Sequence, residues 1–424
     1  HYRKSQYSIG TLLEHRLNQA WTLRQNTRAA YLEVDYNSIY ATGFSPATQQ
    51  RQVARVASLA RPTYHSFAVD NQAEARFVTG PLQHTALFGL DARLLHANTR
   101  TYVAAASRLD VYAPVYGQDL PTLPRGATSV TATNQMQQQL GLYAQDQIRL
   151  DNWILTLNGR QDWADTGTTN TVTRTNSTQR DTAFTGRAAL LHAFESGISP
   201  YVAYSTSFLP AIGTYAPARG GGAFQPTTGE QVELGVKYQP PGSNSLVGAA
   251  IYDLTQQNVS TTDPVNASYS IQTGEVRVRG AELEAKANLF PGFNLLAAFT
   301  AQDAEVTKST TNNIGRRPAA VPSHMASLWG DYSYAVTEDL TLGFGAGIRY
   351  IGNTLGNNAP SAGNPIYHVP SATIVDAVAR ADWKQWRLAV NANNLGNDRI
   401  VQTCQGTCSY APGRTVYATL AYRW

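Results

Sequence analysis

The stretch TVYATLAYRW (residues 415–424) decides the fold class, because its side chains alternate strictly in character. Apolar and aromatic residues occupy every second position: Val416, Ala418, Leu420, Tyr422 and Trp424. Successive side chains of a β-strand point to opposite faces, so this segment has one apolar face and one mixed, polar face. The same alternation runs through residues 231–238, 281–289 and 341–350. Many of these runs are long enough to cross a bilayer as tilted strands, which takes ~9–11 residues.

The connections between these runs favour a membrane barrel over a soluble sandwich. About seventeen candidate strands can be counted, at residues 5–17, 20–35, 66–79, 83–101, 136–149, 152–166, 181–194, 199–209, 228–240, 245–257, 275–290, 292–306, 323–335, 338–352, 369–383, 385–395 and 412–424. Short turns alternate with long polar loops, which fall near residues 36–65, 102–135, 210–227, 307–322, 353–368 and 396–411. Outer-membrane barrels sort their connections in this way, with short turns in the periplasm and long loops outside. We therefore predict an all-β fold, an antiparallel transmembrane β-barrel that occupies residues 1–424 as one domain.

The strand count predicts that more of the barrel precedes this segment. Bacterial single-chain barrels have an even number of strands, and an open sheet edge in lipid leaves backbone groups unpaired. The chain starts at His1-Tyr2-Arg3, immediately before its first candidate strand. We therefore expect an N-terminal part that this segment lacks.

Composition excludes several other classes of protein. Charged residues make up 15% of the chain, the formal net charge is +4, and no basic run is present, which predicts no nucleic-acid partner. No segment has the ~18 consecutive apolar residues of a transmembrane helix. The mean hydropathy of −0.30 fits strands that show lipid only at every second residue.

The charged residues of one predicted strand suggest a water-filled interior rather than catalysis. Glu282 and Glu284 are two residues apart, so a strand places them side by side on one face with Lys286. We expect Arg277 and Arg279 next to them. A carboxylate pair can act in general acid–base chemistry, but we interpret this group as lumenal charges that could hold a plug by salt bridges.

Other motifs give no sign of an active site. Gly343, Gly345 and Gly347 lie within a strand, on one face, and no helix is predicted after them, so we interpret them as clearing space in the lumen rather than as a dinucleotide loop. The eight histidines are scattered, with no pair at metal-ligand spacing. No serine stands in a nucleophile elbow with a plausible triad. We predict no enzymatic activity, no metal site and no cofactor.

The two cysteines, Cys404 and Cys408, fall in a long loop that the alternation of connections assigns to the cell exterior. The periplasm that this loop crosses is oxidising, which favours a local disulfide. Zinc is the alternative, but it would need two further ligands, and none is nearby in sequence. We predict a bridge that stiffens the loop tip and adds little global stability, because it closes a small loop.

Several segments together resemble the barrel of TonB-dependent hydroxamate-siderophore receptors, the ferrichrome receptor group in particular. The resemblance covers essentially the whole chain and rests on TLRQNTRAAY (22–31), YAQDQ (143–147), NGRQDWAD (158–165), GEQVELGVKY (229–238), GEVRVRGAELEAKA (274–287), VPSHMASLWGDY (321–332), NANNLGNDRIV (391–401) and CQGTCSYAPGRTVYATLAYRW (404–424). It implies about 22 strands in the whole barrel, of which this chain would carry about seventeen, starting near the sixth. It also implies an N-terminal plug with an energy-coupling box, neither of which this sequence contains.

The resemblance also implies site residues. Tyr40 and Tyr102 fall at or near positions where loop aromatics approach the ligand in this family. Receptors of this group carry a cystine in the same final loop as Cys404 and Cys408. An aromatic last residue such as Trp424 resembles the signal that barrel-assembly machinery reads.

The function implied is uptake of a ferric siderophore, with a hydroxamate type expected, across the bacterial outer membrane. Iron would enter only as the siderophore chelate. The expected partners are the ferric siderophore, the TonB energising complex and outer-membrane lipid, and we expect a monomer. Two alternatives remain open: a passive porin-like barrel, and a receptor of the same family for cobalamin, haem or a catecholate siderophore.

Overall fold

In the computed structural model, all regular secondary structure of the described residues is β-strand. The described residues are 2–44, 51–117, 129–211, 215, 224–262, 270–272, 274–309, 312–360, 365–404 and 408–424. No helix within these ranges is long and apolar enough to span a membrane. The all-β prediction is confirmed.

Twenty-four strands are present in the described residues, and eighteen of them belong to one antiparallel sheet. The strands of this sheet are β1 (Tyr2–Arg16), β2 (Trp21–Phe44), β3 (Gln52–Ala60), β4 (Thr63–Thr79), β5 (Leu82–Asp110), β6 (Ser129–Leu150), β7 (Trp153–Asn170), β8 (Thr175–His192), β9 (Ile198–Leu209), β10 (Thr227–Tyr238), β11 (Leu246–Gln257), β14 (Glu275–Phe290), β15 (Phe293–Lys308), β16 (His324–Ala335), β17 (Leu340–Ile351), β20 (Ala372–Trp383), β21 (Trp386–Asn393) and β24 (Thr415–Tyr422). The other strands form three small hairpins, β12–β13 (Ser260–Thr262, Ser270–Gln272), β18–β19 (Thr354–Leu355, His368–Val369) and β22–β23 (Val401–Thr403, Ser409–Tyr410).

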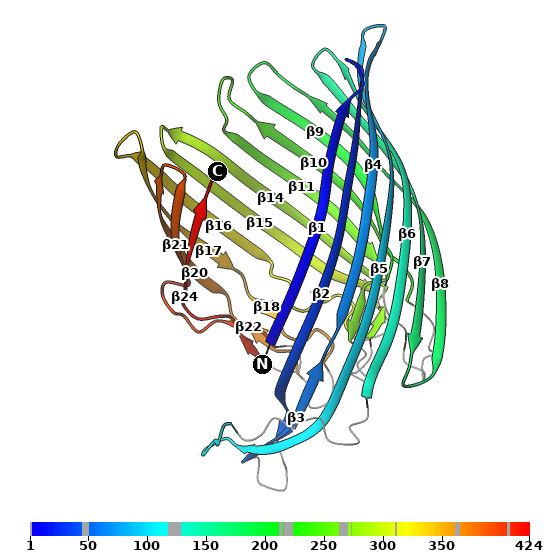
Figure 1. The fold of residues 1–424 in the computed structure, drawn as a ribbon, viewed down its shortest axis with the longest axis vertical. Helices are drawn as coiled ribbons and strands as arrows, with labels where there is room; N and C mark the ends of the chain where they lie inside the picture. The colour runs from blue at the N-terminus through cyan, green and yellow to red at the C-terminus, as the bar shows by residue number, and fades with distance from the viewer. Residues whose placement is uncertain are drawn as a thin grey trace. The chain divides into compact units, whose positions relative to one another are not determined.

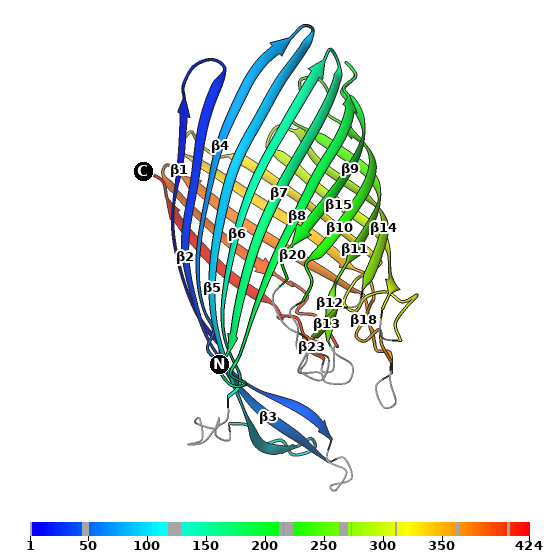
Figure 2. The same cartoon turned by 90° about the vertical axis from the view of Figure 1, so that its right-hand side faces the viewer.

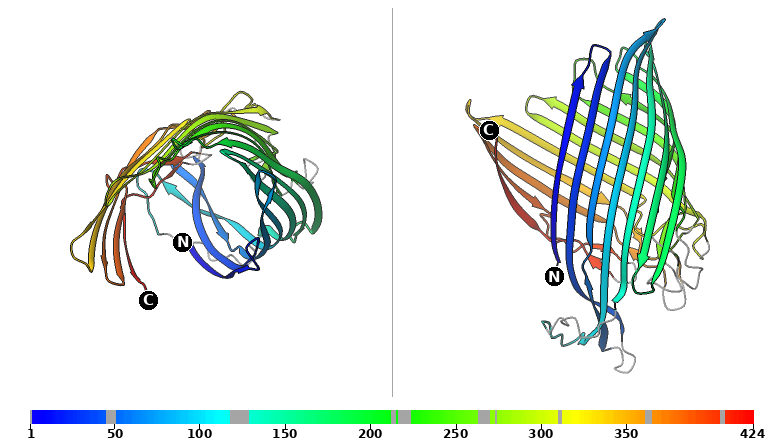
Figure 3. Two further views of the ribbon diagram at one scale, coloured as in Figure 1. Left: turned by 90° about the horizontal axis from the view of Figure 1, so that it is seen from above. Right: turned by 45° about the vertical axis from the view of Figure 1, so that its right-hand side comes forward.

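The chain divides into two compact units. Unit 1 comprises His1–Gln147, Asn158–Gly186 and Pro210–Phe224, and unit 2 comprises Ile148–Leu157, Arg187–Leu209 and Gln225–Trp424. In unit 1, β1 pairs with β2, β2 with β4, and β4 with β5, all antiparallel (Figure 1). In unit 2, each main strand from β9 to β24 pairs with the next, and β14 to β17 run side by side (Figure 3).

Each unit has an apolar and a polar sheet face, as the alternation predicts. Directly opposite residues share a face, so the register carries each face from strand to strand. In β24 and β21, Leu420 lies opposite Leu388, and Tyr422 lies opposite Trp386 with ring centroids 4.8 Å apart. Val416 and Leu420 are 61% and 64% exposed, so no described segment covers this part of the apolar face.

Aromatic rings lie at both ends of the apolar face of unit 1. One row crosses four strands through Tyr7, Tyr31, His65 and His96, whose neighbouring ring centroids lie 4.8–6.4 Å apart. Toward the other end of the same strands, Phe77 stacks on His84 at 4.6 Å. An apolar band between two aromatic girdles is the outer surface of a transmembrane barrel.

Two of the segments expected to be loops contain long strand extensions. β2 continues to Phe44 and pairs there with β3, and β3 pairs with the far end of β5. Figure 2 shows β3 and the adjoining end of β5 projecting beyond the other strands of unit 1. Only ~9–11 residues of a tilted strand fit in the bilayer, so this ribbon is an extramembrane structure that periodicity alone did not separate from a loop.

Several of the most buried apolar side chains lie near the long connections of unit 2. Val306 is 1% exposed, and Val369 of β19 is 3% exposed. β19 lies against β22, and the Ala320 N–H donates to the Leu355 carbonyl of β18 at 2.8 Å. The long connections at 307–322, 353–368 and 396–411 therefore pack together through small hairpins.

Candidate functional site: the polar sheet faces

Glu282, Glu284 and Lys286 lie on one face of β14, opposite the face that carries Ala281 and Leu283. Their cross-strand neighbours cannot pair with them, because these are small, apolar or uncharged: Leu246, Gly248 and Ala250 on β11, and Leu296, Ala298 and Thr300 on β15. None of the ion pairs found among the described residues involves these three side chains. They therefore lie on the polar face without an ion-pair partner among the described residues.

Arg277 and Arg279 were expected beside these charges, and that expectation is wrong. The β14–β15 register runs without a shift from Val276 to Asn288, so odd and even positions keep opposite faces. Arg277 and Arg279 therefore share the face of Ala281. Arg277 Nε donates to Asp253 Oδ1 of β11 at 2.8 Å, and Arg279 lies 3.4 Å from the same carboxylate.

A cavity of about 660 Å³ lies along the polar face of unit 2. Its charged and aromatic lining residues on that face are Tyr201, Glu233, Lys237, Glu282, Glu284, Lys286, Trp329, Arg349 and Asp376. The Tyr201 hydroxyl donates to Glu233 Oε1 at 2.6 Å, and Lys237 Nζ stands 5.3 Å from the centre of the Tyr201 ring. The wall thus offers both charge signs and aromatic surface to whatever fills the space.

Gly343, Gly345 and Gly347 were expected to clear space in the lumen, and in the structure large side chains occupy the space above them. A Cβ at Gly347 would lie 2.5 Å from Trp329 Cε3, and one at Gly345 would lie 2.8 Å from Trp329 Cζ2. A Cβ at Gly343 would lie 2.5 Å from Arg380 Nε. The side chains of Trp329 and Arg380 therefore lie flat over the backbone of β17 rather than extending away from the sheet.

The polar face of unit 1 carries an ion network that sequence reasoning missed. Arg160 of β7 binds both oxygens of Asp91 and both of Asp162, with Nε to Asp162 Oδ2 at 2.8 Å and Nη2 to Asp91 Oδ1 at 3.1 Å. The guanidinium also stands 5.6 Å from the ring centre of Tyr143. A Cβ at Gly141 would overlap the guanidinium. The sequence indicates only that Arg160 and Asp162, two residues apart on one strand, share a face. It does not indicate that Asp91 of β5 is their neighbour.

One carboxyl group at the loop end of β14 has a perturbed acidity. Lys308 Nζ lies 2.7 Å from Glu275 Oε2, and the Thr307 hydroxyl donates to Glu275 Oε1 at 2.8 Å. The Lys308 ammonium, followed by the Thr307 hydroxyl, holds the pKa of Glu275 below its usual range. The carboxylate form of Glu275 is therefore favoured, and its contacts with Thr307 and Lys308 link β14 to β15.

The structure does not bring Tyr40 and Tyr102 to one face. Tyr40 lies opposite Val56 of β3, whereas Tyr102 lies opposite Leu59. The register has no shift between Val56 and Leu59, so the two rings occupy opposite faces of the β2–β3–β5 ribbon. By the alternation along β2, Tyr40 is on the face that continues the polar wall, and it is 44% exposed.

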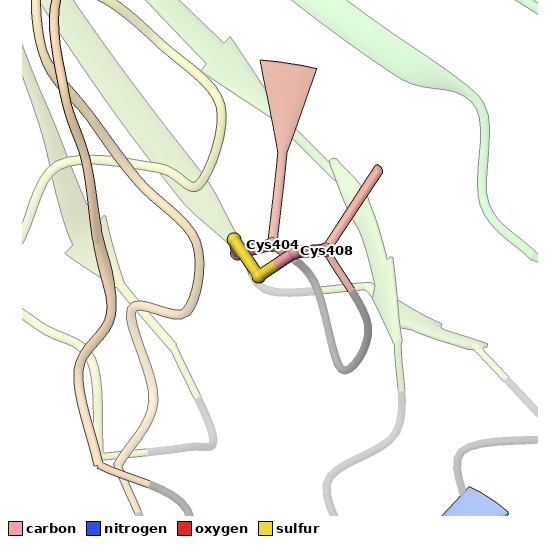
Figure 4. The surroundings of a disulfide bond; sticks show 2 residues. All are labelled: Cys404 and Cys408. Atoms are coloured by element: carbon pink, nitrogen blue, oxygen red, sulfur yellow. A yellow bond between two sulfur atoms is a disulfide. The ribbon is translucent and has the colours of Figure 1, made fainter. Parts of the chain in front are cut away.

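Cys404 and Cys408 are joined by a disulfide (Figure 4). The bridge closes the tip of the β22–β23 hairpin, and Cys404 is 8% exposed. Gly356 packs against it: a Cβ at Gly356 would lie 2.8 Å from the Cys404 Cβ. The bridge thus stiffens one hairpin where it contacts the connection between β18 and β19.

Trp424 lies beyond the last strand, which ends at Tyr422, and its side chain is fully exposed. The Arg423 N–H still donates to the Gln385 carbonyl at 2.9 Å, so the strand register continues almost to the last residue. Among the described residues, no group of three or more His, Cys, Asp or Glu side chains is arranged to hold a metal ion.

A family model described as the TonB dependent receptor-like β-barrel matches residues 1–395. The chain belongs to this family. TonB-dependent receptors are transport proteins of the outer membrane and not enzymes, so the apolar face is the lipid face and the polar face lines the lumen. The sequence-based predictions of family, fold, localisation and absence of an enzyme are confirmed.

Curated relatives of this TonB-dependent receptor barrel carry the names of siderophore receptors. The chain is 34% identical to the ferrichrome outer membrane transporter/phage receptor of Escherichia coli K12, over 100% of the chain and 59% of the relative. It is 34% identical to the ferrioxamine receptor of Yersinia enterocolitica, over 96% and 57%. The chain thus spans less than two thirds of the length of these relatives.

Solved structures agree on the fold of this receptor barrel. The ferric-catecholate import receptor Fiu of Escherichia coli K12, in its closed form, matches with a TM-score of 0.80 over 99% of this chain and 64% of that chain, at 18% identity. The siderophore receptor PiuA of Acinetobacter baumannii matches with a TM-score of 0.77 over the same shares, at 21% identity.

Proposed function

We propose that the full-length protein that contains this barrel imports a ferric siderophore of the hydroxamate type across the outer membrane, driven by the TonB energising complex. Two relatives with 34% identity are named for ferrichrome and ferrioxamine, which are both hydroxamate siderophores. The observation that carries the proposal in this chain is the row of lumenal charges at Glu282, Glu284 and Lys286, which form no ion pair with the described residues.

These charges favour a filled lumen over an open one. An open porin channel would leave these charges in water at little cost, but it would also leave the apolar patch of Leu246, Leu296 and Trp329 exposed to water. A plug domain can pair the charges and cover the apolar patch at once. Gated import, in which a plug moves under an external energy source, is therefore the better fit.

We propose Tyr40 as a ligand contact and assign no ligand contact to Tyr102. A ferric siderophore is a bulky polar chelate with an organic shell, and aromatic rings suit such a shell. Tyr40 is exposed on the ribbon face that continues the lumenal wall, whereas Tyr102 points to the other face. Iron arrives as part of this chelate and has no resident site in the proposal.

The test is ferric-siderophore binding by the full-length receptor, measured by fluorescence quenching across hydroxamates, catecholates, haem and cobalamin. Hydroxamates should bind most tightly. Tyr40→Ala should weaken binding by about 0.5–1.5 kcal/mol, a factor of roughly two to twelve, if the ring supplies ordinary stacking. Tyr102→Ala is the matched control and should leave affinity unchanged.

Measuring siderophore uptake with and without the energising complex distinguishes energised import from passive diffusion through a porin. Cells that lack the energising complex should bind the siderophore normally and take up none. Exclusive binding of haem or cobalamin would show that the substrate class is wrong. Equal uptake without the energising complex would replace the importer with the porin alternative.

A further inference from the structure

A cavity of about 470 Å³ lies along the polar face of unit 1. Arg28 of β2 and Arg93 of β5 line it on either side of Ala68 of β4, because Arg28 lies directly opposite Ala68, and Ala68 lies directly opposite Arg93. All three share the face of Asp70 and Asp91, which is the polar face. The small side chain of Ala68 leaves the space between the two arginines open, so the wall presents two cations to one cavity.

The two arginines lie inside the membrane-spanning part of the lumen. Arg28 is three residues from Tyr31, and Arg93 is three residues from His96, and both of these rings belong to the aromatic row at one border of the apolar face. At ~3.3 Å per residue and a tilt of ~45°, the arginines lie about 7 Å inside that border. Tyr40 is twelve residues further along β2 on the same sheet face, beyond the border. Cargo that leaves Tyr40 along this wall therefore reaches the arginines before the periplasm.

Neither guanidinium is committed to a close partner in the wall. Within the described ranges, the exposed side chain of Arg28 has no hydrogen bond and no ion pair. Arg93 Nε lies 3.9 Å from Asp91 Oδ1, which is a long contact, and the Arg93 side chain is 64% exposed. Arg160 already binds both oxygens of Asp91. The N–H groups of Arg28 and Arg93 are therefore available to a molecule in the cavity.

The carboxylates beside the arginines, in contrast, are already engaged by other side chains. The Tyr143 hydroxyl donates to Asp70 Oδ1 at 2.8 Å, and Gln72 Nε2 donates to Asp70 Oδ2 at 2.7 Å. Asp91 is held by the forked contact with Arg160. The uncommitted charges of this cavity are therefore positive, and they complement a molecule whose surface is rich in oxygen acceptors.

We propose that Arg28 and Arg93 form a transit site for the ferric chelate, which the chelate occupies after it leaves Tyr40 and before it reaches the periplasm. A ferric hydroxamate presents carbonyl and N–O oxygens around its iron, and the planar guanidinium donates to such oxygens through several N–H groups at once. Both arginines are exposed to water, so their contacts with the chelate are weak enough to break again, as passage through successive sites requires. The inference rests on the proposed function and names a second binding place for the same cargo.

The first experiment compares binding with uptake in cells that express the full-length receptor. Arg28→Gln/Arg93→Gln should bind a ferric hydroxamate with wild-type affinity but import it about tenfold more slowly at saturating concentration, because contacts made only during passage affect the rate and not the capture. Arg187→Gln is the matched control, since Arg187 is an exposed arginine on the polar face of unit 2, and it should import at the wild-type rate. Equal uptake by the wild type and the double variant would overturn the transit site and leave import intact. A wild type that imports no hydroxamate would overturn the proposed function itself.

A label between the arginines detects the cargo directly. Ala68→Cys can carry a small fluorophore, which the paramagnetic ferric chelate quenches at close approach and the gallium chelate of the same shape does not. We expect ferric-specific quenching only in cells with the energising complex, and its loss in Arg28→Gln/Arg93→Gln. Importing cells without quenching, or quenching that persists in the double variant, would contradict the transit site.

The alternative occupant of the cavity is a plug segment that the two arginines hold in place. In that case Arg28→Gln/Arg93→Gln would loosen the plug, so the full-length receptor would conduct more ions across planar bilayers and unfold at a lower denaturant concentration than the wild type. We expect conductance and unfolding midpoint to match the wild type. An increase in conductance or a lower midpoint would overturn the transit site in favour of a plug anchor.

Discussion

Removing the guanidinium of Arg160 tests whether the lumenal network of unit 1 is a rigid structural element. The side chains of Arg160, Asp91 and Asp162 are 22%, 8% and 4% exposed. Arg160→Ala leaves two largely buried carboxylates without their main partner, and breaking a buried ion pair costs about 3–5 kcal/mol. Gln139 Nε2 still donates to Asp162 Oδ1 at 2.8 Å, which compensates part of the loss. We therefore expect Arg160→Ala to lower the free energy of unfolding by about 3 kcal/mol.

The assay is the free energy of unfolding of the full-length receptor from denaturant titration in detergent micelles. Arg160→Lys should lose less than Arg160→Ala but remain destabilised, because a single ammonium cannot form forked bonds to two carboxylates. Adding Asp91→Asn to Arg160→Ala should recover part of the loss, since it removes one orphaned charge. A loss for Arg160→Ala below about 1 kcal/mol would mean that the network behaves as a solvated surface pair and would refute the reasoning.

Three further predictions concern the ends and loops of the chain. Trp424→Asp should reduce the heat-resistant barrel in outer-membrane fractions several-fold, and an unchanged amount would exclude a role of this residue in assembly. Mass spectrometry without reduction should find Cys404 joined to Cys408, whereas quantitative alkylation of both thiols under native conditions would contradict this. Lys308 lowers the pKa of Glu275 in the folded protein, so the ionised carboxylate stabilises the fold. This stabilisation is complete at pH values above the unfolded-state pKa of about 4.3, and it is lost as the pH falls through the lower folded-state pKa. Glu275→Gln should therefore lower the unfolding midpoint at pH 7 and flatten its decline below about pH 5.

The alternation of side chains was sufficient to predict most of the sheet. Lipid on one face and water on the other require apolar and polar residues to alternate along each strand. The candidate strand at 275–290 has the same bounds as β14. The same rule could have placed Arg277 and Arg279 correctly, since odd positions cannot share a face with Glu282. β3 was missed because it lies outside the bilayer, where no lipid imposes an apolar face.

The network around Arg160 could not be predicted from the sequence, because it depends on register between strands. Asp91 precedes Arg160 by 69 residues, and only the folding of β5, β6 and β7 side by side brings them together. The distinction between Tyr40 and Tyr102 has the same origin, because each faces the side that its pairing with β3 dictates.

The glycines beneath Trp329 influence how far that side chain reaches into the cavity of unit 2. The indole lies flat because Gly345 and Gly347 have no Cβ. Alanine at both positions would place a methyl carbon within 2.8 Å of the ring and push the indole away from β17. The width of the cavity of about 660 Å³ therefore depends on two missing methyl groups as well as on the large side chains that line it.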